Sequence, residues 1–168
     1  FGRTEFCPGD PVSVHMGVQA GFAAYQWMKD GVVISGATSA DYTATTYGTY
    51  KARFQRVSGG AWSDWSPTPV VVQIKAATVT PPITINGIHS NVLPSPDGST
   101  TVPLSVPAGY ASYEWRRVSD NALMGNTNVI NAGVGSYKVK VTEQYGCSSS
   151  FSDPFAVLSA TGSNLPDA

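Results

Sequence analysis

The sequence predicts an all-β protein composed of two β-sandwich units, and three observations lead to this class. Short apolar segments alternate with polar residues at a period of two, which is typical of half-buried strands. Seventeen glycines and 12 prolines supply frequent turns, and no segment has the pattern of a helix. One arrangement of residues also occurs twice along the chain, which indicates a repeat.

The repeat consists of a Tyr-x-Trp segment followed, 22 or 23 residues after the tryptophan, by the tyrosine of a Gly-x-Tyr segment. The six aromatic residues that define the two copies, and that we expect to form the two cores, are Tyr25, Trp27, Tyr50, Tyr113, Trp115 and Tyr137. We expect each tryptophan to lie at the centre of its unit, because an indole is the largest side chain that a small sandwich can bury.

The spacing of the copies predicts the domain boundaries. We expect a first domain over residues 1–77 and a second over residues 83–160. Paired prolines keep residues 78–82 extended and predict a semi-rigid linker, and the tail at 161–168 has the composition of another linker. Only six residues precede Cys7, so the first copy is expected to lack most of its first strand, as in a piece cut from a longer modular protein.

Alternating residues and turn residues place the individual strands. Residues 12–18 and 102–106 alternate between apolar and polar side chains, which predicts a strand in each copy. Hairpin turns are predicted at Lys29-Asp30-Gly31 and at Pro96-Asp97-Gly98. Several short strands joined in this way favour two antiparallel sheets packed face to face.

Charge and the length of apolar runs argue against a nucleic-acid partner and against a membrane span. Charged residues are 12% of the chain, against about 25% in an average soluble domain, and serine with threonine supplies about a fifth of it. The net charge of −1 argues against nucleic acid, since phosphate binding requires a clustered basic surface. No apolar run reaches about 18 residues, so no membrane span is predicted.

These residues together resemble the immunoglobulin-like, PKD-like repeats of large secreted and surface proteins of Bacteroidetes. The Tyr-x-Trp and Gly-x-Tyr segments look like the core tryptophan of one strand and the tyrosine corner of another. The usual cysteine positions of antibody domains hold Val14, Ala52, Leu104 and Val139 instead. The resemblance implies two tandem immunoglobulin-like domains at an extracellular or cell-surface location, export by type IX secretion, and neighbouring domains of a longer chain as partners.

The two cysteines do not form a pair within either copy. Cys7 precedes the second strand of the first copy, and Cys147 follows the Gly-x-Tyr strand of the second copy. We therefore expect two unbridged thiols. The alternative is a bridge between Cys7 and Cys147, which would need their Cα atoms within about 7 Å of each other.

The segment Trp62-Ser63-Asp64-Trp65-Ser66 is the strongest motif in the chain. It resembles the Trp-Ser-x-Trp-Ser motif of fibronectin-type receptor domains, in which indole rings alternate with arginine side chains of the neighbouring strand. Lys51 and Arg53 have outward parity on the neighbouring strand, so we expect a structural ladder. The alternative is a sugar-binding platform of exposed aromatic side chains, with Trp62, Trp65, Tyr47 and Tyr110 as candidate ligand-binding residues.

The outward positions of the second copy bring together residues of both charges. They are Glu114, Arg116, Lys138 and Lys140. We interpret them as a solvated face with cross-strand ion pairs. The alternative is a site for an acidic ligand.

The remaining polar residues predict no catalytic or metal centre. His15 and His89 are the only histidines, and neither has a nucleophile or a carboxylate at a recognisable spacing. Asp97 and Asp120 lie in loops, where calcium could be held by carboxylate and backbone oxygens. No cofactor and no metal is expected.

The predicted function is that of a non-catalytic extracellular module, a spacer or adhesion unit of a larger secreted or cell-surface protein, and not an enzyme. The alternative is a carbohydrate-binding accessory module of a secreted polysaccharide hydrolase. In that case the partner would be a polysaccharide or a surface glycan.

Overall fold

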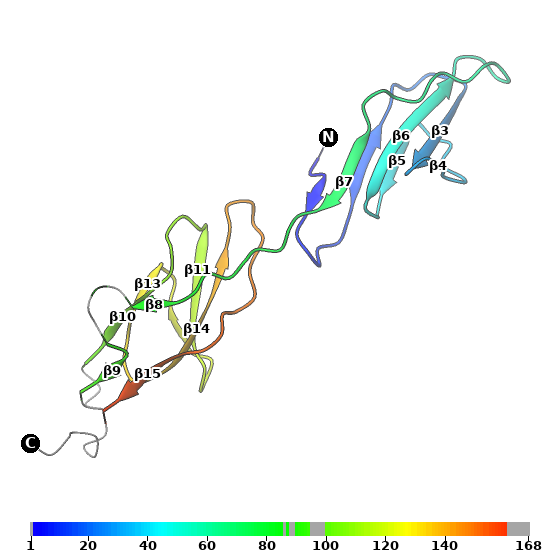
Figure 1. The fold of residues 1–168 in the computed structure, drawn as a ribbon. Helices are drawn as coiled ribbons and strands as arrows, with labels where there is room; N and C mark the ends of the chain where they lie inside the picture. The colour runs from blue at the N-terminus through cyan, green and yellow to red at the C-terminus, as the bar shows by residue number, and fades with distance from the viewer. Residues whose placement is uncertain (1, 86, 88–89, 95–99, 161–168) are drawn as a thin grey trace, which may run out of the picture. The chain divides into compact units, whose positions relative to one another are not determined.

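A computed structural model describes residues 2–85, 87, 90–94 and 100–160 of the chain. This part of the chain contains β-strands and no helix, which confirms the all-β prediction. The structure divides into two compact units, Phe1–Ala76 and Ala77–Ala168. Figure 1 shows the strands of each unit.

The first unit consists of two sheets. Its strands are β1 (Glu5–Phe6), β2 (Val14–Gly17), β3 (Ala24–Lys29), β4 (Val32–Val33), β5 (Asp41–Ala44), β6 (Gly48–Gln55) and β7 (Val70–Ile74). One sheet is the antiparallel pair β2-β5, and the other has the order β1-β7-β6-β3-β4. All pairings are antiparallel except that of β1 with β7, which is parallel.

Both sheets of the first unit contribute side chains to one core, so they form a sandwich. Val14 and Met16 come from β2, whereas Trp27 comes from β3 and Tyr50 and Ala52 from β6. All five are buried. Because successive side chains of a strand point to opposite faces, the residues between them face outward.

The second unit repeats this arrangement with one strand more. Its strands are β8 (Thr84–Ile85), β9 (Val92–Leu93), β10 (Val102–Ser105), β11 (Ser112–Arg117), β12 (Leu123–Gly125), β13 (Val129–Ala132), β14 (Gly135–Thr142) and β15 (Phe155–Ser159). The sheets have the orders β13-β10-β8 and β12-β11-β14-β15-β9. Here β9 is parallel to β15, as β1 is to β7.

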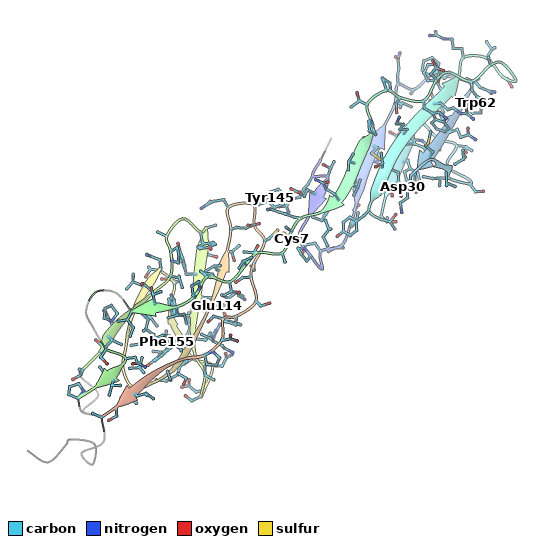
Figure 2. All side chains as sticks on the ribbon, in the orientation of Figure 1. Cys7, Asp30, Trp62, Glu114, Tyr145 and Phe155 are labelled. Carbon is cyan, nitrogen blue, oxygen red and sulfur yellow. The ribbon has the colours of Figure 1, made fainter. Side chains whose placement is uncertain are left out.

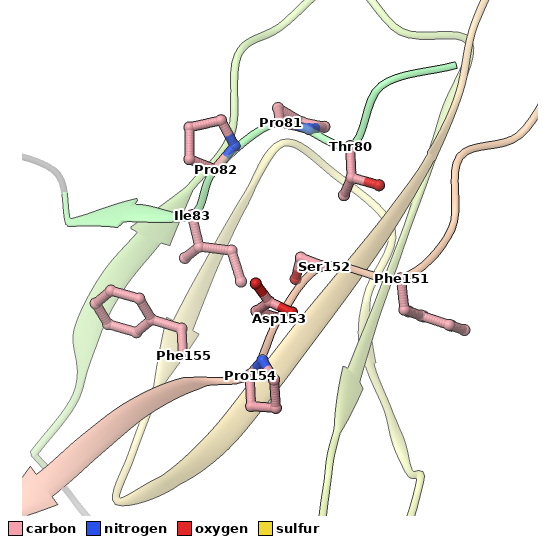
Figure 3. Close-up of a pocket in the computed structure, with 9 residues that line it drawn as sticks. All are labelled: Thr80, Pro81, Pro82, Ile83, Phe151, Ser152, Asp153, Pro154 and Phe155. Carbon is pink, nitrogen blue, oxygen red and sulfur yellow. The ribbon is translucent and has the colours of Figure 1, made fainter. Parts of the chain in front are cut away.

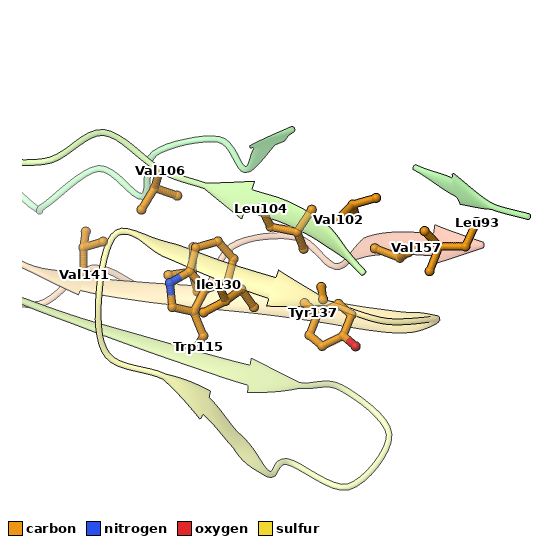
Figure 4. Close-up of a cluster of buried hydrophobic side chains, with 11 residues drawn as sticks. Leu93, Val102, Leu104, Val106, Trp115, Ile130, Tyr137, Val141 and Val157 are labelled. Atoms are coloured by element: carbon orange, nitrogen blue, oxygen red, sulfur yellow. The ribbon is translucent and has the colours of Figure 1, made fainter. Parts of the chain in front are cut away.

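The core of the second unit is centred on an indole. Trp115 is completely buried, and Leu104 and Ile130 of the opposite sheet pack in the same cluster (Figure 4). Tyr137 belongs to this cluster as well. Burial raises the pKa of its phenol above the usual value, because the charged form would lose its hydration.

Each core tryptophan makes the same hydrogen bond. The Nε1–H group of Trp27 donates to the carbonyl of Ser39 at 2.9 Å, and that of Trp115 donates to the carbonyl of Thr127 at 2.8 Å. In both units the acceptor lies 12 residues after the tryptophan. The only polar atom of each buried ring is therefore satisfied.

Each core tyrosine closes a corner in the same way. The hydroxyl of Tyr50 donates to the carbonyl of Thr46 at 2.8 Å, and that of Tyr137 donates to the carbonyl of Gly133 at 3.0 Å. Both bonds reach back four residues, to the segment that enters the strand. Such a bond allows a phenol to be buried without an unsatisfied donor.

Tyr25 and Tyr113 each bond to the segment that precedes their own strand. The hydroxyl of Tyr25 donates to the carbonyl of Gln19 at 3.1 Å, and that of Tyr113 to the carbonyl of Pro107 at 3.4 Å. Tyr25 is buried, whereas Tyr113 is half-buried and packs against the core.

The expectation of unbridged thiols is wrong. Neither cysteine is free, and Cys7 and Cys147 are both disulfide-bonded. Both are also buried. The prediction failed because it counted cysteines within each sequence repeat, whereas a bridge is decided by the positions of Cβ atoms in space.

The predicted linker at 78–82 belongs to the second unit and is hydrogen-bonded to it. The hydroxyl of Thr78 donates to the carbonyl of Cys147 at 3.3 Å, and that of Thr80 donates to the carbonyl of Ser150 at 2.8 Å. The predicted turn at 96–98 and the tail at 161–168 lie outside the described residues.

Candidate ligand-binding site

The Trp-Ser-Asp-Trp-Ser segment runs back along β6 and is fixed to it by its two serines. The hydroxyl of Ser63 accepts from the backbone N–H of Phe54 at 3.0 Å, and the Ser63 N–H donates to the Phe54 carbonyl at 2.8 Å. Ser66 makes the same two bonds with Ala52, at 3.2 and 2.8 Å. Because the serines are three residues apart, the segment is held at two points that flank Arg53.

The guanidinium of Arg53 lies over both tryptophans of the motif. Its central carbon is 5.0 Å from the ring centroid of Trp62 and 4.5 Å from that of Trp65. Its Nε–H donates to the Oε1 atom of Gln26 on β3 at 2.8 Å, which fixes the direction of the side chain. Each contact of this kind is worth about 0.5–2 kcal/mol, according to how far it is removed from water.

Trp62 is the most accessible part of this ladder. Its side chain is exposed (Figure 2), whereas Trp65 is half-buried. Trp62 is among the lining residues of two hollows of about 480 and 360 Å³. Sugar stacking requires an open ring face. The Arg53 guanidinium occupies one face of each indole, so that face is closed to a sugar.

Tyr47 lies away from this surface, and Tyr110 belongs to the other unit. Tyr47 packs against the core of the first unit and directly precedes β6, whereas Trp62 pairs with Gln55 at the other end of that strand. The eight-residue strand separates them by roughly 23 Å. Tyr110 belongs to the second unit, where it packs against the core and edge-on to Tyr113.

The second unit contains the same serine ladder, which the sequence analysis missed. The hydroxyl of Ser149 accepts from the Val141 N–H at 3.1 Å and that of Ser152 from the Val139 N–H at 3.1 Å. The N–H groups of both serines donate back to the same residues at 2.8 Å. The signal in the sequence was the three-residue spacing of the serines, of which the first follows the tyrosine of the Gly-x-Tyr segment by 13 residues in one copy and 12 in the other.

A phenylalanine takes the place of an indole in this second ladder. The ammonium groups of Lys138 and Lys140 lie 4.6 and 5.1 Å from the ring centroid of Phe151. Phe151 stands one residue before Ser152, as Trp65 stands one residue before Ser66. The cation–aromatic ladder is thus a shared feature of the fold in both units.

The charged face of the second unit is internally paired. Glu114 accepts from the Nε–H of Arg116 at 2.8 Å and forms an ion pair with Lys140 at 3.0 Å. The hydrogen bond from Arg116, followed by that from Lys140, lowers the pKa of this carboxyl below its usual value. Each of the three cations of this face thus contacts Glu114 or Phe151, and Lys140 contacts both, which supports a structural role over an acidic-ligand site.

The other candidates are placed in local contacts. Asp120 is bonded to the guanidinium of Arg117 and to the Ala122 N–H, and the Arg117 bond is the main reason why its pKa falls to about 2. His15 is exposed, with its Nε2 atom 3.6 Å from Asp41.

Asp97 and His89 lie outside the described residues. Within the described ranges, no three His, Cys, Asp or Glu side chains gather as a group that could hold a metal.

A further hollow of about 510 Å³ lies in the second unit (Figure 3). Ile83 and Asp153 point toward one another across it, and Pro154 and Phe155 follow along the same edge. Its lining mixes aliphatic, aromatic and polar side chains, with an exposed carboxylate.

No family model and no curated protein matches the sequence. Among solved structures, the chain is similar to the human OSCAR ligand-binding domain, with a TM-score of 0.40 and 14% identity over 93% of this chain and 94% of that one. In the part of the chain that the structure describes, no helix is long and apolar enough to cross a membrane.

Proposed function

We propose that the chain is a pair of tandem immunoglobulin-like domains that act as a non-catalytic spacer or adhesion module in a larger secreted or cell-surface protein. The observation that carries this proposal is that one architecture is built twice, with the same hydrogen bonds from tryptophan, tyrosine and serine. A structural unit that is repeated with its supporting bonds unchanged is what an array of modules requires.

The strand arrangement supports the immunoglobulin-like assignment. In the first unit β2 and β5 form one sheet, while β3, β6 and β7 form the centre of the other. In the second unit β10 and β13 correspond to the first pair, and β11, β14 and β15 to the second set. This division of strands, together with the buried tryptophan and the tyrosine corner, matches the pattern of immunoglobulin-type sandwiches.

Two features support a location outside the cell. Both cysteines are disulfide-bonded, and disulfides persist in oxidising compartments. The surface is poor in charge, and several of its charged groups are paired with neighbours on the same unit. Such a surface creates no strong field toward a particular partner, which suits a module whose neighbours are other domains.

A second candidate function, carbohydrate binding, is favoured by one observation. Trp62 is exposed and lines two hollows, as an aromatic side chain of a sugar-binding face would. Against it, a cation covers one face of each indole, and Trp65 is half-buried.

Retention on insoluble polysaccharides separates the two functions. We expect the whole chain to stay in the supernatant, and Trp62→Ala and Trp65→Ala to behave like the parent. Ile74→Ala is the matched control, since it removes an exposed apolar side chain from another strand of the same unit.

Retention that both tryptophan variants lose and the Ile74→Ala control keeps would overturn the spacer role in favour of sugar binding.

A second measurement, the thiol content of the protein, tests whether the protein is secreted. Protein from its native host, unfolded without reductant, should show no thiol by Ellman's assay, and a full thiol signal there would contradict secretion.

A further inference from the structure

The smaller sheet of the first unit lacks a strand that the second unit possesses. In the second unit β8 lies beside β10 (Figure 1) and pairs with it antiparallel. Leu104 is opposite Ile85, and Ser105 is opposite Thr84. The counterpart of β10 in the first unit is β2, which pairs with β5 as β10 pairs with β13. Among residues 2–76, β2 pairs with β5 alone.

The free edge of β2 exposes backbone groups that can accept a strand. The Val18 N–H donates to the Ala40 carbonyl at 2.9 Å, in register with the β2-β5 pairing. Because hydrogen-bonded positions alternate along an antiparallel strand, the backbone groups of His15 and Gly17 face away from β5. Both residues are exposed. An edge of this kind is a template for pairing with another segment.

The β2 edge differs between the two units, because β10 has a strand on each side and β2 has one on a single side. The other free edge of the sheet belongs to β5, whose counterpart β13 is itself terminal in the second unit. The fold therefore leaves that edge open in both units. Among the strands of the described ranges, only the β2 edge is open where its counterpart in the other unit is covered.

The side chains of β8 in the second unit indicate which kind of segment could pair with the β2 edge. Ile83 and Ile85 pack against the core, while the hydroxyl of Thr84 between them donates to the Ser105 carbonyl at 3.3 Å. A segment with aliphatic side chains at alternate positions and a small polar residue between them meets both requirements. Such a segment would extend the first core at its Val12–Val18 side, where both residues are partly buried against the cluster.

We propose that the open edge of β2 accepts an extended antiparallel segment of this pattern, supplied by the polypeptide that leads into this unit. In the second unit β8 comes shortly before β9, and β9 pairs with β15 as β1 pairs with β7. The equivalent strand of the first unit therefore enters from ahead of β1. This inference rests on the proposed role as a module of a longer protein.

The test adds a strand to the existing chain. Val92 is 87 positions after Glu5, so residues 80–87 (Thr-Pro-Pro-Ile-Thr-Ile-Asn-Gly), fused directly ahead of residue 1, reproduce the spacing of β8 and β9. The matched control carries the same octapeptide with both isoleucines replaced by aspartate. Amide hydrogen exchange at His15 and Gly17, measured by NMR, reports on the edge, and size-exclusion chromatography reports the oligomeric state.

We expect the isoleucine fusion to slow exchange at both amides by about tenfold or more, as a monomer, and the aspartate fusion to match the parent chain. Equal exchange in the two fusions would overturn the proposal. Protection that appears only in a dimer would overturn the assignment of the strand to the same polypeptide. Because exchange is measured on the purified chain, this result does not depend on where the parent protein acts or on whether it binds sugar.

Discussion

At the scale of single residues, each core contains a tyrosine whose hydroxyl group is hydrogen-bonded within apolar surroundings. The phenols of Tyr50 and Tyr137 are buried, and each hydroxyl finds one backbone carbonyl four residues earlier. A buried donor without an acceptor costs about 1–3 kcal/mol, so these bonds decide which residue type fits each corner.

Removal of one of these tyrosine hydroxyls should therefore lower the stability of the folded protein only modestly. We expect Tyr50→Phe and Tyr137→Phe each to lower the free energy of unfolding by about 1 kcal/mol, since the carbonyl loses its partner while the ring stays packed. Urea denaturation measures this. Tyr110→Phe is the control, because its hydroxyl makes no hydrogen bond within the described residues. A Tyr137→Phe variant as stable as the parent would show that the corner bond is not stabilising.

At the scale of elements, a serine ladder ties an irregular segment to the strand before it in both units. The two ladders differ in burial, since Ser149 is buried whereas Ser63 is half-buried. The hydroxyl of Ser149 bonds to the Val141 N–H, and that of Ser63 bonds to the Phe54 N–H. Water can replace a lost bond at Ser63 more easily than at Ser149.

The two serines should therefore respond differently to the same substitution. We expect Ser149→Ala to cost about 1–3 kcal/mol, because the Val141 N–H stays buried without a partner, and Ser63→Ala to cost about 0.5–1.5 kcal/mol. Chemical denaturation of both variants measures the difference. Ser150→Ala serves as the control, since its side chain is exposed. Equal losses at Ser149 and Ser63 would contradict a role for burial.

At the scale of the whole molecule, the chain contains two separate cores. Trp27 belongs to one cluster and Trp115 to the other, and no residue is shared between the two clusters. Each indole contributes the largest side chain to its own cluster, so its removal acts on one unit first.

Truncation of either tryptophan should therefore affect its own unit. We expect Trp27→Ala and Trp115→Ala each to cost about 3–5 kcal/mol, through lost burial and the cavity left behind. The amide signals of Ala52 and Val139, followed by NMR during urea titration, report on the two units separately. A Trp27→Ala variant that shifts both transitions equally would show that the units unfold as one body.

Several features could be predicted from local sequence. The Lys29-Asp30-Gly31 turn is confirmed: Asp30 and Gly31 both have positive φ, which a two-residue hairpin loop requires. The ladder at Trp62 and Trp65 was indicated by a motif with four matching positions. The second ladder kept its serines but only one aromatic residue, Phe151, so local pattern alone did not reveal it.

The sequence by itself determined the all-β class, because a period of two in the side chains and frequent turn residues act over a few neighbouring positions. The tertiary structure alone decided that Cys7 and Cys147 are oxidised, that Tyr47 lies far from Trp62, and that the edge of β2 is open. These features depend on which distant segments lie side by side. That is decided by sheet pairing and core packing across the whole unit, and no short window of sequence contains it.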